Sequence, residues 1–265
     1  MLINRGFLQF ISALKIQLRV VVALFLRETR TTFGNSSLGY LWAIITPALG
    51  VAFLVIIFSF ASRQPPFGQS LALFFATGLL TFEFYSKLSN SLTTVLDSNK
   101  ALLVYPIVNQ SSAILARSLL VMITYLIIMC IFYGVLISSG LAHFPANPVK
   151  LFFAFLNICL LGFAVGILNL AIFNFWDSWI HVWKIINRPL FFISGIFFIP
   201  SLLPEKALNY LQWNPVLHLV EAFRSSYYPN YDSRVLNPIY LIVLSLIFIF
   251  IGLFFERLGR RKSKN

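Results

Sequence analysis

Long uncharged stretches recur along the chain, and charged residues mark the ends of most of them. A helix needs roughly 20 apolar residues to cross the ~30 Å apolar core of a bilayer. Because lipid offers the backbone no hydrogen-bond partners, each stretch is expected to be a continuous helix. The fifth is the shortest, and Pro200 interrupts it. The pattern predicts six membrane spans, at residues 38–61, 70–96, 112–142, 149–176, 182–203 and 235–256.

A different pattern precedes the first span, over residues 7–31. Apolar residues spaced three and four apart predict a helix with one apolar face. Lys15 and Arg19 lie off that face, and a basic amphipathic helix of this kind lies in the membrane interface. Its role is open between an anchor and a surface for a cytoplasmic partner. The predicted face comprises Leu8, Ile11, Leu14, Leu18, Val21 or Val22, and Phe25.

The polar segment between the second and third spans predicts a short helix at residues 97–106. Asp97 or Ser98 can cap its start, and Pro106 would end it. Such a helix is either a simple connector or a docking element for a motor protein.

The segment before the last span, residues 204–230, predicts two short helices that dip into the membrane or cap a cavity. Asn214 is a typical N-cap, followed by proline at the first helical position. His218, Glu221 and Arg224 are spaced three apart and lie near one another. The alternative is an aromatic belt at the membrane–water interface, formed by Tyr210, Trp213, Tyr227 and Tyr228.

Composition supports an integral membrane protein. The chain is 59% hydrophobic and 11% charged, whereas soluble domains carry about 25% charged residues. Of its 20 Lys and Arg residues, fifteen fall on the side of the termini and five on the other. The positive-inside rule then predicts that both termini are cytoplasmic. This location accounts for most of the net charge of +12, and no nucleic acid is expected as a partner.

Motifs of known enzymes are missing from the sequence. It lacks the phosphate loop of ATP-binding proteins, the His-Glu-x-x-His zinc motif and the Gly-x-Ser-x-Gly elbow. Glu83 is the acidic residue well inside an apolar stretch, with Lys87 four positions later. The two form either a structural ion pair or part of a transport path. A membrane enzyme with Glu83 or His218 as its acid or base is the alternative. Cys130 and Cys159 are expected to be core residues, and no signal peptide is apparent.

Two motifs carry a family resemblance. Residues 27–47 follow the pattern R-E-x(4)-F-G-x(3)-L-G-x(2)-W-x(4)-P, and residues 213–224 read W-N-P-V-L-H-L-V-E-A-F-R. Together with the order of the elements, they resemble the permease subunit of type-2 ABC exporters, in particular the capsular polysaccharide export branch. The resemblance covers essentially the whole chain.

The resemblance implies a transport subunit rather than an enzyme, with residues 1–265 as one transmembrane domain. Two copies would pair and bind two copies of a separate ABC ATPase, which would hold ATP and Mg, so this chain would hold no cofactor. A lipid-linked polysaccharide would cross the bacterial inner membrane. A periplasmic co-polymerase or adaptor and an outer-membrane protein would carry it onward. O-antigen, teichoic acid or a small drug are the alternative cargoes.

The resemblance also implies roles for particular residues. Coupling to the ATPase would involve Arg27, Glu28, Asp97, Ser98, Asn99, Lys100, Leu102, Tyr105 and Pro106. A hinge turn would include Gly34, Leu38 and Gly39. The substrate path would be lined by Tyr40, Trp42, Glu83, Tyr85, Phe191 and Phe192. A periplasmic gate would contain Trp213, Asn214, Pro215, His218, Glu221, Arg224, Tyr227 and Tyr228.

Overall fold

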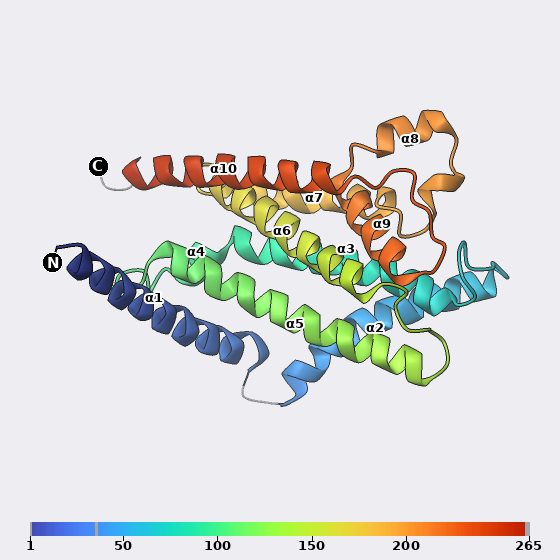
Figure 1. Ribbon diagram of the computed structural model, residues 1–265, viewed down its shortest axis with the longest axis horizontal. Coiled ribbons are helices and arrows are strands. Elements are labelled where there is room, and N and C mark those ends of the chain that lie inside the picture. Colours follow the sequence, from blue (N-terminus) through green and yellow to red (C-terminus); the bar gives the residue numbers. More distant parts are fainter. Residues whose placement is uncertain (1, 35–36, 263–265) are drawn as a thin grey trace.

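The computed structural model describes residues 2–34 and 37–262, with side chains at 14–32, 34, 39 and 41–257. Every regular element in these ranges is a helix, which confirms the predicted all-helical class. The start of α1 and the end of α10 lie at the same end of the bundle, here called the inner end; α8 and α9 lie at the outer end (Figure 1). The elements are α1 (Leu2–Phe33), α2 (Ser37–Phe60), α3 (Leu71–Thr93), α4 (Val95–Ser98), α5 (Gln110–Ser138), α6 (Pro148–Phe173), α7 (Trp179–Ile193), η1 (Pro200–Leu202), α8 (Glu205–Leu211), α9 (Pro215–Tyr227) and α10 (Pro238–Lys262).

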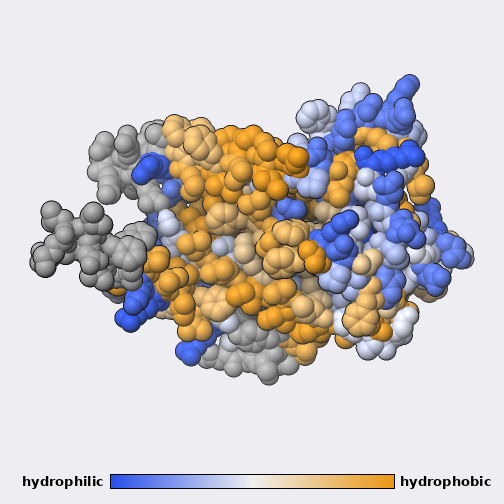
Figure 2. Space-filling model, viewed as in Figure 1, coloured by the Kyte–Doolittle hydropathy of each residue, from blue (hydrophilic) through white to orange (hydrophobic). Residues whose placement is uncertain are grey.

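Five helices of the described chain are long and apolar enough to cross a membrane, and they overlap five of the six predicted spans. Their apolar side chains form a broad band on the face drawn in Figure 2, while hydrophilic residues gather at the outer end. The five candidate spans are Leu41–Phe60, Leu71–Thr93, Gln110–Ser138, Pro148–Phe173 and Pro238–Arg257.

The fifth predicted span is interrupted. Helix α7 has 15 residues and ends at Ile193, so it is about 22 Å long, shorter than the apolar core of a bilayer. Gly195 then adopts φ +78, a conformation that glycine reaches without steric cost. Pro200 starts the short 3-10 helix η1. The continuous helix predicted for residues 182–203 is therefore incorrect, because a left-handed glycine and a proline break it.

Helix α3 lies at the centre of the bundle and packs against α2, α5, α6 and α9. All ten residues from Leu73 to Phe82 are buried, so the helix is covered on every side over that length. Its polar residues are tolerated because they find partners within the helix. Thr77 donates to the carbonyl of Phe74 at 2.9 Å, and Thr81 donates to that of Thr77 at 2.8 Å.

Small residues bring α6 close to α3. A Cβ added at Gly162 would lie 3.0 Å from the side chain of Leu88, and one at Gly166 would lie 2.8 Å from that of Leu92. Glycines four residues apart on one helix face let two membrane helices approach closely. On another face of α6, Gly252 of α10 makes a similarly close contact with Ile167. Helix α6 is thus in close contact with α3 on one face and with α10 on another.

Helix α1 packs mainly against α5, and only part of the predicted apolar face is buried. Val21, Leu24 and Glu28 are 6%, 5% and 1% exposed. Val21 belongs to the predicted face and Phe25 of that face is half-buried, whereas Leu14 and Leu18 are 49% and 56% exposed. Periodicity identifies an apolar face but not what covers it, and here much of that face points away from the protein. Leu8 and Ile11 lie outside the residues whose side chains are described.

Among the described residues, the turn predicted at Gly34 to Gly39 is seen at Gly34 only. Gly34 adopts φ +70 and donates its amide to the carbonyl of Arg30 at 2.9 Å, which ends α1. Gly39 lies inside α2, so the turn does not extend to it as predicted. The backbone of Leu38 also belongs to α2, and its side chain is outside the described set.

The helix predicted at residues 97–106 is also different. Helix α4 ends at Ser98, with Asp97 inside it rather than at its cap. A series of turns follows, in which Leu102 donates to the carbonyl of Asn99 at 2.9 Å and Tyr105 donates to that of Leu102 at 3.1 Å. Proline at 106 has no amide to continue a helix. The segment is therefore a short helix followed by turns, at the inner end of the bundle.

Candidate functional site

A polar network at the inner end joins three segments that are far apart in sequence. Glu28 of α1 is almost fully buried and forms an ion pair with Arg117 of α5, with 2.6 Å between Nε and Oε2. Asn99 donates from Nδ2 to Oε1 of Glu28 at 2.8 Å and accepts from Arg27 at 3.1 Å. Arg117 also donates to Ser98 at 3.2 Å. We call Arg27, Glu28, Ser98, Asn99 and Arg117 the inner network.

The inner network includes four residues for which the family resemblance implies a role in ATPase coupling. The others in that group lie beyond it: Asp97, Lys100, Tyr105 and Pro106 are exposed, and Leu102 is half-buried. Arg117 was missed, because a charge near the start of a long apolar helix looks like an ordinary boundary residue. Only the tertiary structure shows that it neutralises a buried carboxylate, which would otherwise carry a large desolvation penalty.

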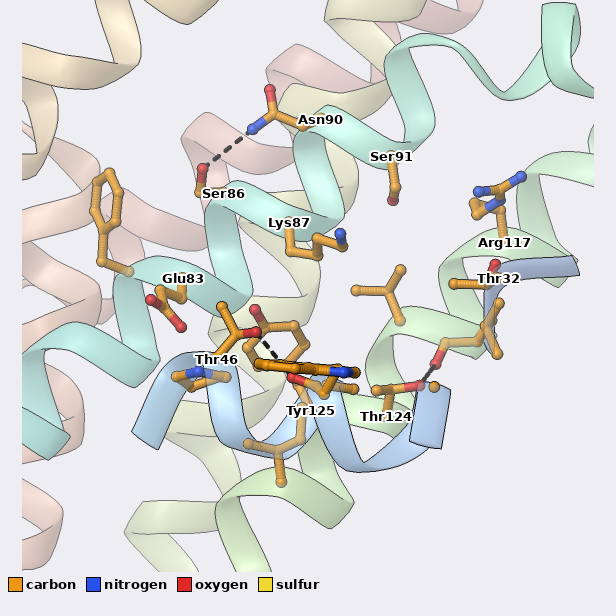
Figure 3. A pocket seen from close by; sticks show the side chains of 18 residues that line it. Thr32, Thr46, Glu83, Ser86, Lys87, Asn90, Ser91, Arg117, Thr124 and Tyr125 are labelled. Atoms are coloured by element: carbon orange, nitrogen blue, oxygen red, sulfur yellow. Dashed lines mark hydrogen bonds between the residues drawn. The ribbon is translucent and has the colours of Figure 1, made fainter. Parts of the chain in front are cut away.

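A cavity of about 730 Å³, here called the inner cavity, lies between α2, α3 and α5, next to the inner network. Glu83, Lys87 and Ser91 of α3 line it at four-residue intervals. Trp42 of α2 and Tyr125 of α5 supply aromatic faces. Figure 3 shows Glu83 and Lys87 along one wall and Arg117 at one side. The volume is within the roughly 300–1,000 Å³ typical of small-molecule sites.

Glu83 and Lys87 both line the inner cavity, and in this described region they form no ion pair within 4.0 Å. Of the two roles left open by the sequence, the geometry is more consistent with lining. Charged residues in a membrane segment are costly unless they face protein or a water-filled cavity. The cavity supplies that environment for both side chains.

The remaining path residues occupy different surroundings. Trp42 is 61% exposed and lines the inner cavity. Tyr85 is buried beside Phe82. Phe191 packs edge-on against Phe82 at 5.2 Å between ring centroids, whereas Phe192 is 62% exposed. The side chain of Tyr40 lies outside the described residues. The structure thus brings Trp42 and Glu83 to one cavity and leaves Tyr85, Phe191 and Phe192 off its lining.

At the outer end, α9 begins as the sequence predicts. Asn214 accepts from the amide of Val216 at 3.0 Å, and Pro215 is the first helical residue. Asn214 also donates to the carbonyl of Ile193 at 3.1 Å, at the end of α7. The cap therefore ties the start of α9 to the break after α7.

Arg224 of α9 also binds the non-helical segment after α7, from the buried side of that segment. Its side chain is fully buried, and its guanidinium donates to the carbonyls of Gly195 at 2.6 Å and Ile196 at 3.2 Å. It also lies 4.0 Å from the ring centroid of Phe74. The two carbonyl oxygens accept the charge-assisted hydrogen bonds that a buried guanidinium requires. Arg224 thus joins α9 to α3 and to the non-helical segment after α7.

Two further polar residues of α9 anchor the segment that leads to α10. Glu221 accepts from Tyr231 at 2.6 Å and from Ser233 at 2.5 Å. Burial raises the pKa of Glu221, although those hydrogen bonds and the charge of Arg224 oppose the shift. Burial lowers the pKa of His218, whose Nε2 lies 2.7 Å from the carbonyl of Gln212. These contacts tie α9 to the end of α8 and to the segment before α10.

The aromatic residues of the outer segment divide into two groups. Tyr210 and Trp213 are 84% and 70% exposed, as an interfacial belt requires. Tyr227 and Tyr228 are buried, and the hydroxyl of Tyr227 donates to the carbonyl of His143 at 3.0 Å. The four aromatic residues therefore do not share one environment, and only Tyr210 and Trp213 have the exposure that a belt needs.

Comparison of the sequence with known protein families gives a match over most of its length. Residues 19–228, most of the chain, match the sequence model of the ABC-2 type transporter family. The chain belongs to this family. The ABC-2 match includes α2 to α9 completely and therefore contains the inner network, the inner cavity and Arg224.

Relatives of this ABC-2 chain carry names from capsule export. It is 31% identical to the polysialic acid transport protein KpsM of Escherichia coli, over 91% of this chain and 94% of the relative. It is 26% identical to the capsule polysaccharide export inner-membrane protein CtrC of Neisseria meningitidis serogroup A, over 92% of each chain. It is 28% identical to a Haemophilus influenzae protein of the same description, BexB, also over 92% of each.

Proposed function

We propose that this chain is the permease subunit of an ATP-driven exporter that carries lipid-linked capsular polysaccharide across the bacterial inner membrane. The observation that carries the proposal is the near full-length similarity to KpsM, CtrC and BexB. Those relatives are named for capsule polysaccharide or polysialic acid transport. The five long apolar helices agree with a multi-pass membrane protein.

The proposed topology has six crossings. Helix α7 together with residues 194–202 returns the chain to the outer end, where α8 and α9 lie (Figure 1). With six crossings, both termini are on one side, and the excess of Lys and Arg at the inner end makes that side cytoplasmic. The outer segment at residues 204–230 would then face the periplasm as a gate.

ATP hydrolysis is assigned to a separate subunit, which would hold ATP and Mg. Two copies of that ATPase would bind a homodimer of this chain. The exposed Val104, Tyr105 and Ile107, which follow α4 at the inner end, offer an apolar surface for it. The inner network connects this segment to α1 and α5, so movement of the docked ATPase would reach two helices together. Arg27 and Glu28 belong to this connection.

The cargo would enter from the cytoplasmic side and leave between the two permeases, with the same surface used twice around the two-fold axis. Trp42 gives an exposed aromatic face on which a sugar ring can pack. At the outer end, the buried contacts of Arg224 and Glu221 keep the gate segment ordered. A periplasmic adaptor and an outer-membrane export protein would take the polymer onward.

The proposal is tested by deleting the gene from the producing bacterium and locating the polymer. Surface capsule should disappear while polymer accumulates inside the cells, and the gene on a plasmid should restore it. Normal surface polymer in the deletion strain would contradict the capsule assignment.

Variants of the inner network test the coupling role. Asn99→Ala removes the hydrogen bonds to Glu28 and Arg27, so export should fall severalfold while the chain still inserts in the membrane. Asn209→Ala, at an exposed position of the outer helix α8, is the matched control and should export normally. Export that is unchanged in Asn99→Ala, at equal membrane levels, would argue against coupling through this network.

A further inference from the structure

Arg117 is shared by the inner network and the inner cavity. It is part of the inner network through Glu28 and Ser98, and it lines the inner cavity. Its Nε and Nη2 make the contacts to Glu28, and Nη2 also reaches Ser98. None of these contacts uses Nη1. The buried carboxylate of Glu28 therefore holds the guanidinium beside the cavity through two of its three nitrogens.

The inner cavity is electrically polarised along its length. Glu83, Lys87 and Ser91 occupy successive turns of α3, so Glu83 and Ser91 are separated by about 12 Å along the helix. In Figure 3 the ammonium of Lys87 points toward the side of the cavity where Ser91 and Arg117 lie, and the carboxylate of Glu83 points the other way. The end near the inner network thus carries two cationic side chains, Lys87 and the Arg117 that pairs with Glu28, with the hydroxyl of Ser91 on the same side. The far end is acidic.

We propose that the cationic end of the inner cavity binds an oxyanion attached to a sugar, and that this binding is sensed through Arg117 by the inner network. The inference rests on the proposed export function and identifies a part of the cargo that the chain recognises. A phosphate that links sugar to lipid and the carboxylate of an acidic sugar share this chemistry.

The physical basis is competition for one guanidinium. Arginine binds oxyanions through several donors in a fixed plane, and Lys87 adds a second charge. An incoming oxyanion draws Arg117 toward the cavity and weakens its pair with Glu28. Because Glu28 also accepts from Asn99 at 2.8 Å, a weaker pair with Arg117 changes the contact between α1 and the segment after α4. A neutral sugar has no charge with which to compete.

The experiment uses the complete permease–ATPase complex in lipid nanodiscs. The ATPase rate is measured against glucose 1-phosphate and against glucuronate, with glucose as the uncharged control. At least one charged sugar should raise the rate at millimolar concentrations, and glucose should not. The two charged probes separate the sources: a response to phosphate indicates the lipid linkage, and a response to carboxylate indicates an acidic sugar of the polymer.

Three variants separate binding from sensing. Lys87→Gln should raise the half-saturating probe concentration about tenfold, whereas the matched control Lys150→Gln, at an exposed position on the outer part of α6, should leave it unchanged. Arg117→Lys keeps the charge but cannot bridge Glu28 and an oxyanion, so stimulation should be lost. Asn99→Ala should lose the stimulation of the ATPase but still bind the probe. Binding is followed by quenching of the fluorescence of Trp42, and the Trp42→Phe variant shows which part of the signal comes from that residue.

Equal stimulation by glucose would overturn the oxyanion assignment, as would an unchanged half-saturating concentration in Lys87→Gln. Quenching of Trp42 by a charged probe without any change in ATPase rate would overturn the sensing role. A complex that exports polymer but responds to no probe would contradict this inference and leave the proposed function intact. A complex that neither exports polymer nor hydrolyses ATP would contradict the proposed function itself.

Discussion

At the scale of single residues, the buried charges of this chain are held by contacts that sequence spacing only partly reveals. The three-residue spacing of His218, Glu221 and Arg224 predicts that they lie on one side of a helix. Yet each reaches a different partner: Arg224 the break after α7, Glu221 the segment before α10, and His218 the end of α8. Their shared function is to fix the outer segment.

Replacement of Arg224 tests this anchoring. Lysine keeps the charge but has fewer donors, so Arg224→Lys should leave buried carbonyls unsatisfied and destabilise the protein by at least about 2 kcal/mol. The midpoint of thermal unfolding in detergent measures the loss. Arg63→Lys is the control, because Arg63 is exposed and lies 5.7 Å from the ring centroid of Phe58. An unchanged midpoint in Arg224→Lys would mean that the carbonyl contacts contribute little.

His218 gives a pH-dependent prediction. Burial lowers its pKa below the ordinary value of 6.5, so the folded protein binds the proton more weakly than the unfolded chain does. Its contribution to stability is therefore complete above pH 6.5 and is lost as the pH falls through that value toward the lowered pKa. Unfolding midpoints at pH 8 and pH 5 should differ less in His218→Gln than in the natural chain. An equal pH dependence in both proteins would contradict this prediction.

At the scale of elements, particular residues and contacts fix the points at which helices end. The end of α7 combines a left-handed glycine, three carbonyls that accept from Arg224, and a hydrogen bond from the side-chain amide of Asn214. The turn at Gly34 similarly separates α1 from α2. Because Gly39 lies within α2 and lines the inner cavity, a valine there would affect function by filling the cavity rather than by stiffening a turn.

Gly195→Ala tests the break after α7. Its φ of +78 is unfavourable for alanine, and the added Cβ would lie 2.7 Å from Cδ1 of Leu217. The expected cost is about 1–2 kcal/mol from the backbone alone, measured as a lower unfolding midpoint. Gly134→Ala is the matched control, because it is inside α5 with no atom within 4 Å of the new Cβ. Equal midpoints for the two variants would show that the break tolerates a side chain.

At the scale of the whole molecule, the inner network and the gate segment lie at opposite ends of one bundle. Helix α3 connects them: its outer half contacts Arg224, and its inner half lines the inner cavity. A change at the inner end can therefore be transmitted along one helix, whose outer half is buried on every side from Leu73 to Phe82.

Cysteine labelling tests the orientation of this bundle. In a chain with Cys130 and Cys159 replaced by alanine, Gln69→Cys lies at the outer end and Asn109→Cys at the inner end. A membrane-impermeant maleimide added to intact spheroplasts should label Gln69→Cys alone. After permeabilisation it should label both. Labelling of Asn109→Cys in intact spheroplasts would reverse the proposed orientation.

The sequence by itself determined the all-helical membrane class, the positions of five long helices and the cap at Asn214. These features depend on local properties: apolar run length, charge boundaries and residues that suit a helix start. Two motifs were enough to suggest the family. The same local rules did not locate the end of α7, because Gly195 and its carbonyl contacts act together with Arg224, 29 residues away.

Only the tertiary structure decided which face of α1 is buried, that Glu28 pairs with Arg117, and that Glu83 and Lys87 line a shared cavity. The physical reason is that ion pairs and cavities depend on how separate helices are juxtaposed. Positions 28 and 117 are 89 residues apart, and no local pattern relates them. Apolar periodicity shows that a helix has a face to cover, but lipid and protein can both cover it, and packing makes that choice.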